Sequence, residues 1–514
     1  ALVSALWARA AGPGAAEPPR ATAPASAPLA SGERLRSRDG GPLAAVPLLV
    51  VLVVDQMRAD TLDRFPPSGP GGFSRLLREG AYFSQARNID VPTETSPGHA
   101  TLLTGRPPSV HCVVAYDWWD PGTRRMVYSV EDPVFGRSPR NLLSPTLGDA
   151  LKSGDPASRV VSISGKDRSG ILLGGHRPDA AIWYEPETGG FATSPYYGPL
   201  PSWAARFTAR RPLGFTLTPA FDRLILDAAL EAVRSLSLGA DEHADLLAVG
   251  ISGVDVVGHR HGPDHPSMDA QLEGLDEGLG RFLSELDRLV GRGRYALVLA
   301  SDHGVLPVPE SPPGRALGAR RILFRDWLAQ AERALEARLP RPGGQDGRAA
   351  RRGGWIEAGF PPNIHLDRSS AARSGLGRDA LLREAAAALA GLDSVAEVFT
   401  SDRLEGFATD SSSYSAVFQR AYCPGRSGDL MVLLKPFVFI ADGPEGTGHG
   451  LPYDYDARVP LVFAGPDIPP GRRGLPASLE DIAPTAARLI GVDFPPGPGS
   501  RVLEEIFQPM DGSH

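Results

Sequence analysis

Residues 47–55 read PLLVVLVVD, a run of Leu and Val that stops at an acidic residue. Even with the preceding PLAAV, the apolar stretch is shorter than the roughly 18 residues that a membrane-spanning helix needs. Its length and its valines are typical of a strand buried on both faces, as in the parallel sheets of α/β proteins. We therefore interpret residues 47–54 as a buried strand that ends at Asp55, and we expect no membrane span.

Other segments of the chain share these features, and helical patterns lie between them. The further segments that we interpret as buried parallel strands are RVVSIS (159–164), DLLAVGIS (245–252), YALVLAS (295–301) and VPLVFAG (459–465). The clearest helix presents one apolar face with steps of three and four residues, formed by Met268, Leu272, Leu275, Leu279, Phe282, Leu286 and Leu289. Strands that alternate with helices predict an α/β fold with a mostly parallel central sheet flanked by helices.

Composition shifts along the chain suggest its organisation. Residues 1–45 are rich in Ala, Pro and Gly, which is typical of a disordered leader or of the remnant of a secretory signal. Between residues 305 and 440 the alternation breaks, with Pro/Gly/Arg-rich loops and a β-rich end. We predict an α/β core at 46–312, an insertion or cap at 313–440, completion of the core at 441–507 and a tail at 508–514.

The overall charge and the cysteine content narrow the class of protein. The 514 residues carry a net charge of -7, which argues against a nucleic-acid partner, and we expect a small-molecule substrate and a monomer or weak oligomer. The two cysteines, Cys112 and Cys423, form neither a disulfide framework nor a thiolate metal site; they could pair or stay free. Together with the signal-like leader, this content leads us to expect a periplasmic or secreted protein.

Charged and imidazole side chains follow the predicted strands. In an open parallel sheet, ligands bind outside the carboxyl ends of the strands, so we expect these side chains to meet at one edge. Taken singly, each is more typical of a turn or a solvated surface. The side chains in question are Asp55, Lys166, Arg168, Asp255, His259, Asp302 and His303, and His449 joins them from a glycine-rich loop.

Asp and His together are suitable ligands for borderline divalent cations, of which zinc is our first expectation. A two-metal site can stabilise both the attacking and the leaving oxygen of a phosphoryl transfer, and it can activate a hydroxyl nucleophile. The seven candidate donors for two divalent cations are Asp55, Thr95, Asp255, His259, Asp302, His303 and His449.

The stretch VPTETSPGHATLLTG (91–105) is open to two interpretations. A hydroxyl residue shortly before Pro is a common helix start, where the hydroxyl caps free N–H groups. The same helix N-terminus also suits a phosphoryl group, so that one of these hydroxyls could be a nucleophile.

Five ordered motifs resemble the alkaline phosphatase superfamily. They are VVDQMRAD (53–60), TETSPGHATLLTG (93–105), SGVDVVGHRHGP (252–263), SDHG (301–304) and GTGHGLPYDYDARVP (446–460). The resemblance implies a two-zinc centre with Asp55, Thr95, Asp302 and His303 on one metal and Asp255, His259 and His449 on the other. It also implies that Thr95 is the nucleophile, so that the stretch at 91–105 is both a helix start and the site of catalysis.

The segment SGKDRSGILLGGH (164–176) resembles the threonine-nucleophile bacterial alkaline phosphatases, which hydrolyse monoesters. That resemblance implies that Lys166 and Arg168 bind the non-bridging phosphate oxygens, and that the reaction passes through a phosphothreonine. Two extra cations favour a dianionic monoester over a singly charged diester.

One position departs from that pattern. An Asn that contacts phosphate in those enzymes falls on Tyr116 here, whose hydroxyl could donate one hydrogen bond. Tyr116 therefore favours a first alternative, a phosphodiesterase or nucleotide pyrophosphatase on the same two-metal scaffold. A second alternative is a catalytically silent metal- or phosphate-binding protein, which the presence of all seven candidate ligands opposes.

Overall fold

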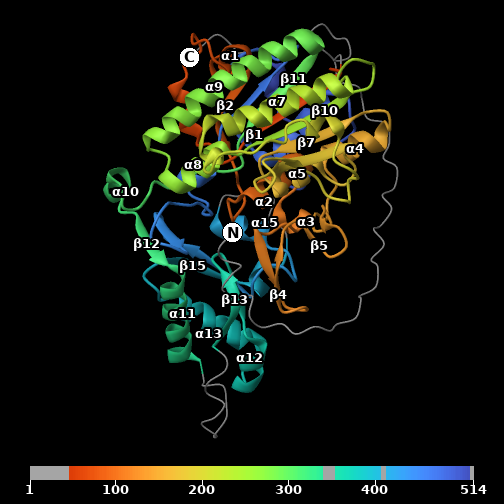
Figure 1. The fold of residues 1–514 in the computed structure, drawn as a ribbon. Helices are drawn as coiled ribbons and strands as arrows, with labels where there is room; N and C mark the ends of the chain where they lie inside the picture. Colours follow the sequence, from red (N-terminus) through yellow and green to blue (C-terminus); the bar gives the residue numbers. More distant parts are fainter. Residues whose placement is uncertain (1–44, 340–353, 407–412, 510–514) are drawn as a thin grey trace.

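The computed structural model describes residues 45–339, 354–406 and 413–509. The predicted leader and tail lie outside these ranges, apart from one or two residues at their borders. The centre of the structure is a nine-stranded sheet, flanked by helices on both faces (Figure 1). Its strands, in spatial order, are β19 (Gly471–Ser478), β2 (Ala81–Arg87), β18 (Leu461–Ala464), β11 (Tyr295–Ala300), β1 (Leu48–Val54), β10 (Asp245–Ile251), β7 (Val160–Ser164), β8 (Ala180–Glu185) and β9 (Gly190–Ala192).

Strand β1 occupies the middle of the sheet, as its uninterrupted apolar sequence predicts. It pairs in parallel with β10 on one side and β11 on the other. Alternate side chains enter two hydrophobic cores: Leu48 and Leu52 pack on one face, and Leu49 and Val53 pack on the other. Because both faces are covered, neither can carry a polar residue until the strand ends at Asp55.

Helices cover each face of this sheet. One face packs against α1 (Gly72–Glu79), α7 (Pro219–Leu236), α8 (Gly253–His261) and α9 (Pro266–Leu286). The other packs against α2 (Thr95–Thr104), α4 (Leu147–Gly154) and α17 (Ile482–Leu489). Helix α5 (Asp167–Gly174) follows β7. None of the helices within the described ranges is long and apolar enough to cross a membrane.

The predicted α/β fold with a mostly parallel sheet is confirmed, with one correction. Residues 459–465 were expected to form another parallel strand, but β18 runs antiparallel to both of its neighbours, β11 and β2. A parallel connection needs a crossover that returns the chain to the opposite edge. Only the single turn of α16 (Asp454–Ala457) lies between the His449 loop and β18. This connection is too short for a crossover, so β18 runs in the direction opposite to its neighbours.

A second body, which we call the cap, is built from residues 320–441 and lies below the central sheet in Figure 1. It overlaps the predicted insertion at 313–440. Its four-stranded antiparallel sheet consists of β13 (Ile356–Phe360), β14 (Asn363–Leu366), β16 (Leu430–Leu434) and β15 (Val395–Thr400). Two further strands pair beside it, β12 (Arg320–Leu323) and β17 (Val438–Ala441). Its helices are α11 (Phe324–Arg338), α12 (Arg368–Ser374), α13 (Arg378–Ala390), α14 (Ser401–Leu404) and α15 (Tyr414–Ala421).

Smaller elements lie between the larger ones, and some of them reach the cap. Between α2 and α4 the chain forms α3 (Pro108–His111) and two hairpins, β3 (Asp117–Asp120) with β4 (Arg125–Tyr128) and β5 (Glu131–Asp132) with β6 (Gly136–Arg137). The remaining helices are α6 (Ser202–Ala205) and α10 (Pro312–Ala316). The β3–β4 hairpin reaches toward the cap, where β3 lies against β13.

Two contacts attach the cap to the region around α2. Cys112, just after α3, forms a disulfide with Cys423 of the cap. Three residues earlier, the fully buried Arg420 forms ion pairs with Asp90 and Glu480 of the core. The pairing that the sequence left open is therefore resolved, and the bridge lies close in sequence to the helix that starts at Thr95.

The bridge gives a first prediction. The double variant Cys112→Ala/Cys423→Ala should lose about 2–4 kcal/mol in its free energy of unfolding, because a cross-link restricts the unfolded chain. The two cysteines are 311 residues apart in sequence, so the restricted loop is long. Urea unfolding followed by circular dichroism, with and without a reductant, measures this loss.

The reductant supplies the control for that experiment. It should lower the midpoint of the wild-type protein toward that of the double variant and leave the variant unchanged. Equal midpoints for the two oxidised proteins would contradict a stabilising bridge.

Candidate active site

Four neighbouring strands of the sheet deliver polar side chains to one edge. Asp55 directly follows β1, and Asp302 and His303 follow β11. Asp255 lies in the first turn of α8, after β10, and Lys166 precedes α5, after β7. The strands are parallel and adjacent, so their carboxyl ends place these groups side by side, as the sequence analysis expected.

The predicted metal ligands converge into two overlapping groups. In one, ligand atoms of Asp55, Asp302 and His303 all lie within 4.8 Å of one another; in the other, those of Asp255, His303 and His449 do. His259 Nε2 lies 3.2 Å from Asp255 Oδ1 and 3.3 Å from His449 Nε2. The second group therefore also contains His259, and His303 stands between the two groups, whereas the sequence assigned it to one of them.

The imidazoles have a fixed orientation. The Nδ1 atoms of His259, His303 and His449 donate hydrogen bonds to the backbone carbonyl oxygens of Thr447, Gly304 and Thr93, at 2.8, 2.9 and 2.6 Å. In this arrangement each Nε2 carries a lone pair that can bind a metal, and histidine ligands are commonly held in this way. His303 Nε2 is buried without a hydrogen-bond partner among the described residues and lies 3.5 Å from Asp55 Oδ1.

Electrostatics at this edge favour cations. Burial, together with the neighbouring carboxylates of Asp255 and Asp302, raises the pKa of Asp55 to about 6. The ammonium of Lys166 bridges Asp55 Oδ2 and Asp255 Oδ2, at 2.5 Å from each. Carboxylates and neutral imidazoles are the donor set of zinc and related divalent cations. The residues present therefore fit a site for divalent cations, without selecting one metal.

Thr95 is the first residue of α2, and its Oγ1 lies 3.5 Å from Asp55 Oδ1. The residue at the N-cap position is Glu94, and no side chain caps this helix. The helix start at this stretch is confirmed, but its hydroxyls do not serve as caps. Helix α2 reaches the metal ligands closely because residue 98 is Gly, where an added Cβ would lie 2.8 Å from the Cβ of Asp302.

A cavity of about 560 Å³ opens beside Thr95, and the cap forms one of its walls. Arg168 and Tyr116 line it on the core side, and Phe360 and His365 line it on the cap side. Trp118 and Trp119 of β3 contribute to the wall, although both are largely buried. Tyr116 therefore lies beside Thr95 and Arg168, as the counting of residues predicted.

Three further residues support the carboxylates, and two of them, Gln56 and Asn88, were missed by the sequence analysis. Gln56 donates from its backbone N to Asp302 Oδ1 and from its Nε2 to Asp255 Oδ1. Its φ of 66° is uncommon for a residue other than Gly, and such strain is typical of functional sites. His99 Nδ1 lies 3.0 Å from Asp302 Oδ2, and Asn88 donates to the backbone carbonyl of Asp302. A Gln directly after the strand-ending Asp carried no recognisable signal.

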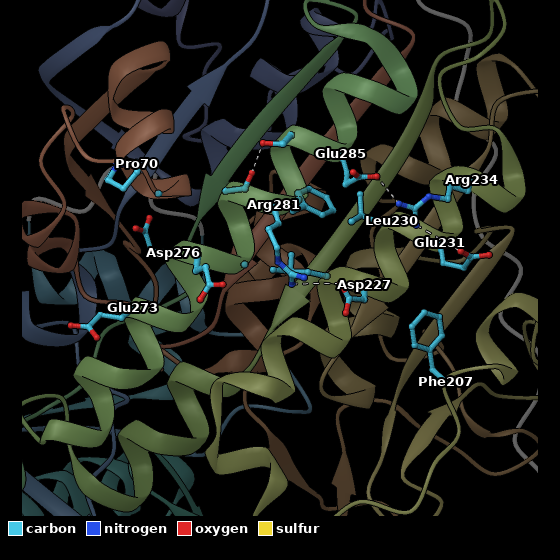
Figure 2. A pocket seen from close by; sticks show the side chains of 17 residues that line it. Pro70, Phe207, Asp227, Leu230, Glu231, Arg234, Glu273, Asp276, Arg281 and Glu285 are labelled. Atoms are coloured by element: carbon cyan, nitrogen blue, oxygen red, sulfur yellow. Dashed lines mark hydrogen bonds and ion pairs between the residues drawn. The ribbon is translucent and has the colours of Figure 1, made fainter.

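A larger cavity, of about 910 Å³, lies elsewhere, between α7, α9 and the residues just before α1 (Figure 2). Its wall contains several carboxylates, but neighbouring arginines neutralise some of them. Arg234 pairs with Glu285 at 2.8 Å, and Arg281 pairs with Asp227 at 3.7 Å. None of its lining residues belongs to the metal-ligand groups, so the smaller cavity beside Thr95 is the candidate active site.

Comparisons with known proteins agree with this assignment. The chain is 30% identical to alkaline phosphatase PafA of Elizabethkingia meningoseptica, over 90% of this chain and 94% of that protein. It is also 30% identical to alkaline phosphatase PhoK of a Sphingomonas species, over 88% of this chain and 90% of that protein. The crystal structure of PafA matches with a TM-score of 0.81 at 28% identity, over 91% of this chain and 100% of that one. The similarity therefore extends over both the core and the cap.

The fold and the site together define a phosphoric ester hydrolase. The family of type I phosphodiesterases and nucleotide pyrophosphatases matches residues 49–457. The chain belongs to this family, within the alkaline phosphatase superfamily.

The ligand geometry gives a second prediction. Removal of divalent cations with a chelator should abolish ester hydrolysis and lower the melting temperature, because the buried carboxylates then lose their counter-charge. If cations are present at 1,000 times their dissociation constant, the loss of stability is about 4 kcal/mol. Elemental analysis, calorimetry and a turnover assay, before and after re-addition of zinc, measure these effects.

Matched histidine variants make this test specific. His449→Ala should lower the bound metal content, whereas His261→Ala, in the same helix as His259 but outside both ligand groups, should leave it unchanged. Undiminished metal content in His449→Ala would remove that residue from the centre.

Proposed function

We propose that this protein is a metal-dependent phosphatase that hydrolyses phosphate monoesters through a phosphothreonine intermediate. The observation that carries the proposal is that three features meet at one edge of the sheet. They are the Thr95 hydroxyl, the two ligand groups, and the cationic side chains of Lys166 and Arg168. The alkaline phosphatases to which the chain is similar support the hydrolysis of monoesters.

In this reaction Thr95 Oγ1 gives its proton to water and attacks the phosphorus atom in line with the leaving alcohol. The P–O bond to the alcohol breaks while the bond to Thr95 forms, and the leaving alkoxide takes up a proton from water. Water then cleaves the phosphothreonine, which releases inorganic phosphate and restores the threonine hydroxyl. Two divalent cations, most simply zinc, would favour the ionised hydroxyl and stabilise the charge on the leaving oxygen.

The cationic residues bind the phosphoryl group. Lys166 and Arg168 flank the start of α5, where the helix N-terminus also favours an anion. In the structure the Lys166 ammonium pairs with Asp55 and Asp255, and divalent cations held by these carboxylates would release it for the substrate. Two cationic donors match the two negative charges of a monoester.

We infer in addition that the protein functions in the periplasm or outside the cell. The Cys112–Cys423 disulfide supports this inference, because such bridges persist in oxidising compartments and are rare in the cytosol. The signal-like composition of the first 45 residues points in the same direction.

A phosphodiesterase or nucleotide pyrophosphatase activity is the second candidate. The family name includes both activities, and an aromatic residue, Tyr116, lines the cavity beside Thr95. Lys166 and Arg168 oppose this candidate, since a diester carries one negative charge less.

The nucleophile gives a third prediction. Thr95→Ala should lower kcat at least roughly 10³-fold, because it removes the hydroxyl that lies 3.5 Å from Asp55 Oδ1 at the ligand groups. Initial rates on p-nitrophenyl phosphate, with metal content and melting temperature measured in parallel, test it.

Ser96→Ala is the matched control for that variant. Ser96 is the neighbouring hydroxyl, and its Oγ contacts Ser129 Oγ at 2.9 Å instead of a ligand group. It should keep most of the activity. A Thr95→Ala protein that binds metal and still turns over at a wild-type rate would exclude the phosphothreonine.

The cationic pair gives a fourth prediction. Lys166→Ala and Arg168→Ala should each reduce kcat/KM for p-nitrophenyl phosphate on the order of 10²-fold, the typical effect of losing one preorganised donor to transition-state charge. The reduction for methyl p-nitrophenyl phosphate, a diester with the same leaving group, should be smaller. A wild-type protein that prefers the diester would replace the monoesterase proposal with the second candidate.

A further inference from the structure

The guanidinium of Arg168 lies against an aromatic ring, and the nearby carboxylates act on its charge only from beyond ion-pair distance. Its Cζ lies 4.9 Å from the centre of the Tyr116 ring, and its Nε is buried without a hydrogen-bond partner among the described residues. In the described ranges no carboxylate forms an ion pair with this side chain. Lys166, two residues earlier, is by contrast bonded to Asp55 and Asp255. The two cations of the site are therefore held in chemically different ways.

A second ring, which is itself held by a partly exposed ion pair, fixes the position of the Tyr116 ring. The rings of Tyr116 and Tyr128 are 4.9 Å apart and tilted by 53°. The Tyr128 hydroxyl donates to Asp167 Oδ1 at 2.5 Å, and Arg137 Nε donates to Asp167 Oδ2 at 2.9 Å. Asp167 directly precedes Arg168 at the start of α5. The contacts that hold the Tyr116 ring are therefore anchored next to the residue that this ring supports.

The backbone of Tyr116 is also fixed on both sides. Its N–H donates to Glu94 Oε2 at 2.8 Å, and its carbonyl accepts from the N–H of Ser129 at 3.0 Å. Glu94 is the residue immediately before Thr95. The ring that carries Arg168 is thus tied, through one hydrogen bond, to the start of the helix that carries the nucleophile.

This arrangement has a chemical consequence. A carboxylate partner would orient Arg168 but would also cancel its charge and compete with an anionic substrate. A ring face attracts the cation through its quadrupole and leaves the N–H groups free to bind phosphate oxygens. An aromatic support therefore suits a cation whose role is to meet a dianion.

We propose that Tyr116 is a positioning residue that holds Arg168 against the phosphoryl group through its ring face, and that it thereby sets the preference for monoesters over diesters. This inference rests on the proposed function, in which Arg168 binds a non-bridging oxygen. It differs from the two earlier expectations for Tyr116, that its hydroxyl itself donates to phosphate and that an aromatic residue at this position favours a diester. The two roles depend on different parts of the side chain, so they can be separated.

The test compares Tyr116→Phe, which keeps the ring and lacks the hydroxyl, with Tyr116→Leu, which lacks both. Each is made in the wild-type and in the Arg168→Ala background, and kcat and KM are measured on p-nitrophenyl phosphate and methyl p-nitrophenyl phosphate. Tyr116→Leu should reduce the monoester-to-diester ratio of kcat/KM about tenfold, in the range of a desolvated cation–π contact. Tyr116→Phe should keep the ratio, and Tyr116→Leu should add nothing in the Arg168→Ala background.

Three results would overturn the proposal. Equal loss of the ratio in Tyr116→Phe and Tyr116→Leu would assign the effect to the hydroxyl. A loss that is the same for both substrates, or that persists without Arg168, would reduce Tyr116 to a structural role. If Tyr116→Leu does not fold, Tyr116→Met removes the ring face with an unbranched side chain and is judged by the same ratio.

The Arg168→Ala protein separates this proposal from the proposed function. If Arg168→Ala itself leaves the monoester-to-diester ratio of kcat/KM unchanged, the proposal that Arg168 binds the dianion is wrong. The proposed role of Tyr116 then falls with it. If Arg168→Ala lowers the ratio and Tyr116→Leu does not, the proposed function stands and the ring support alone is refuted.

Discussion

Mutual repulsion among three buried carboxylates is the constraint on which the site depends. Asp55, Asp255 and Asp302 are each at most 3% exposed, and they meet because β1, β10 and β11 are adjacent parallel strands. Such a concentration of negative charge away from water is stable only with cationic partners and oriented donors. Three kinds of group offset this negative charge: the ammonium of Lys166, the N–H groups of Gln56 and the divalent cations that the ligands fit.

Buried ion pairs and a disulfide hold the cap in a fixed position relative to this centre. Arg420 is fully buried between Asp90 and Glu480, and Asp90 also accepts a hydrogen bond from Thr101 in the helix that starts at Thr95. Removing either acid would leave an uncompensated charge in the interior, so these contacts are costly to break. The disulfide close by adds a covalent constraint. The wall that the cap contributes to the cavity is therefore fixed relative to the nucleophile.

The parts of the structure that follow local patterns could be predicted from the sequence. Buried strands such as 47–54 have a distinctive composition, and polar residues at their ends meet by topology alone. Edge strands lack that signal: β19, with the sequence GRRGLPAS, contains two arginines and a proline, and it escaped prediction. The direction of β18 depends on the connection before it. The position of His303 between both ligand groups, and the support from Gln56, depend on distances that no spacing encodes.

The choice between monoester and diester lies outside the metal ligands, because both reactions develop charge on the attacking and leaving oxygens. It depends on how much positive charge faces the remaining phosphate oxygens. In the structure Lys166 is bonded to two carboxylates, whereas Arg168 lies against the Tyr116 ring and forms no ion pair within the described ranges. On the proposed mechanism both cations face the substrate once divalent cations occupy those carboxylates, and of the two it is Arg168 that depends on an aromatic support. A chain that replaced its aromatic support with an acid would keep the fold, the metal centre and the nucleophile, and would lose the preference for a dianion.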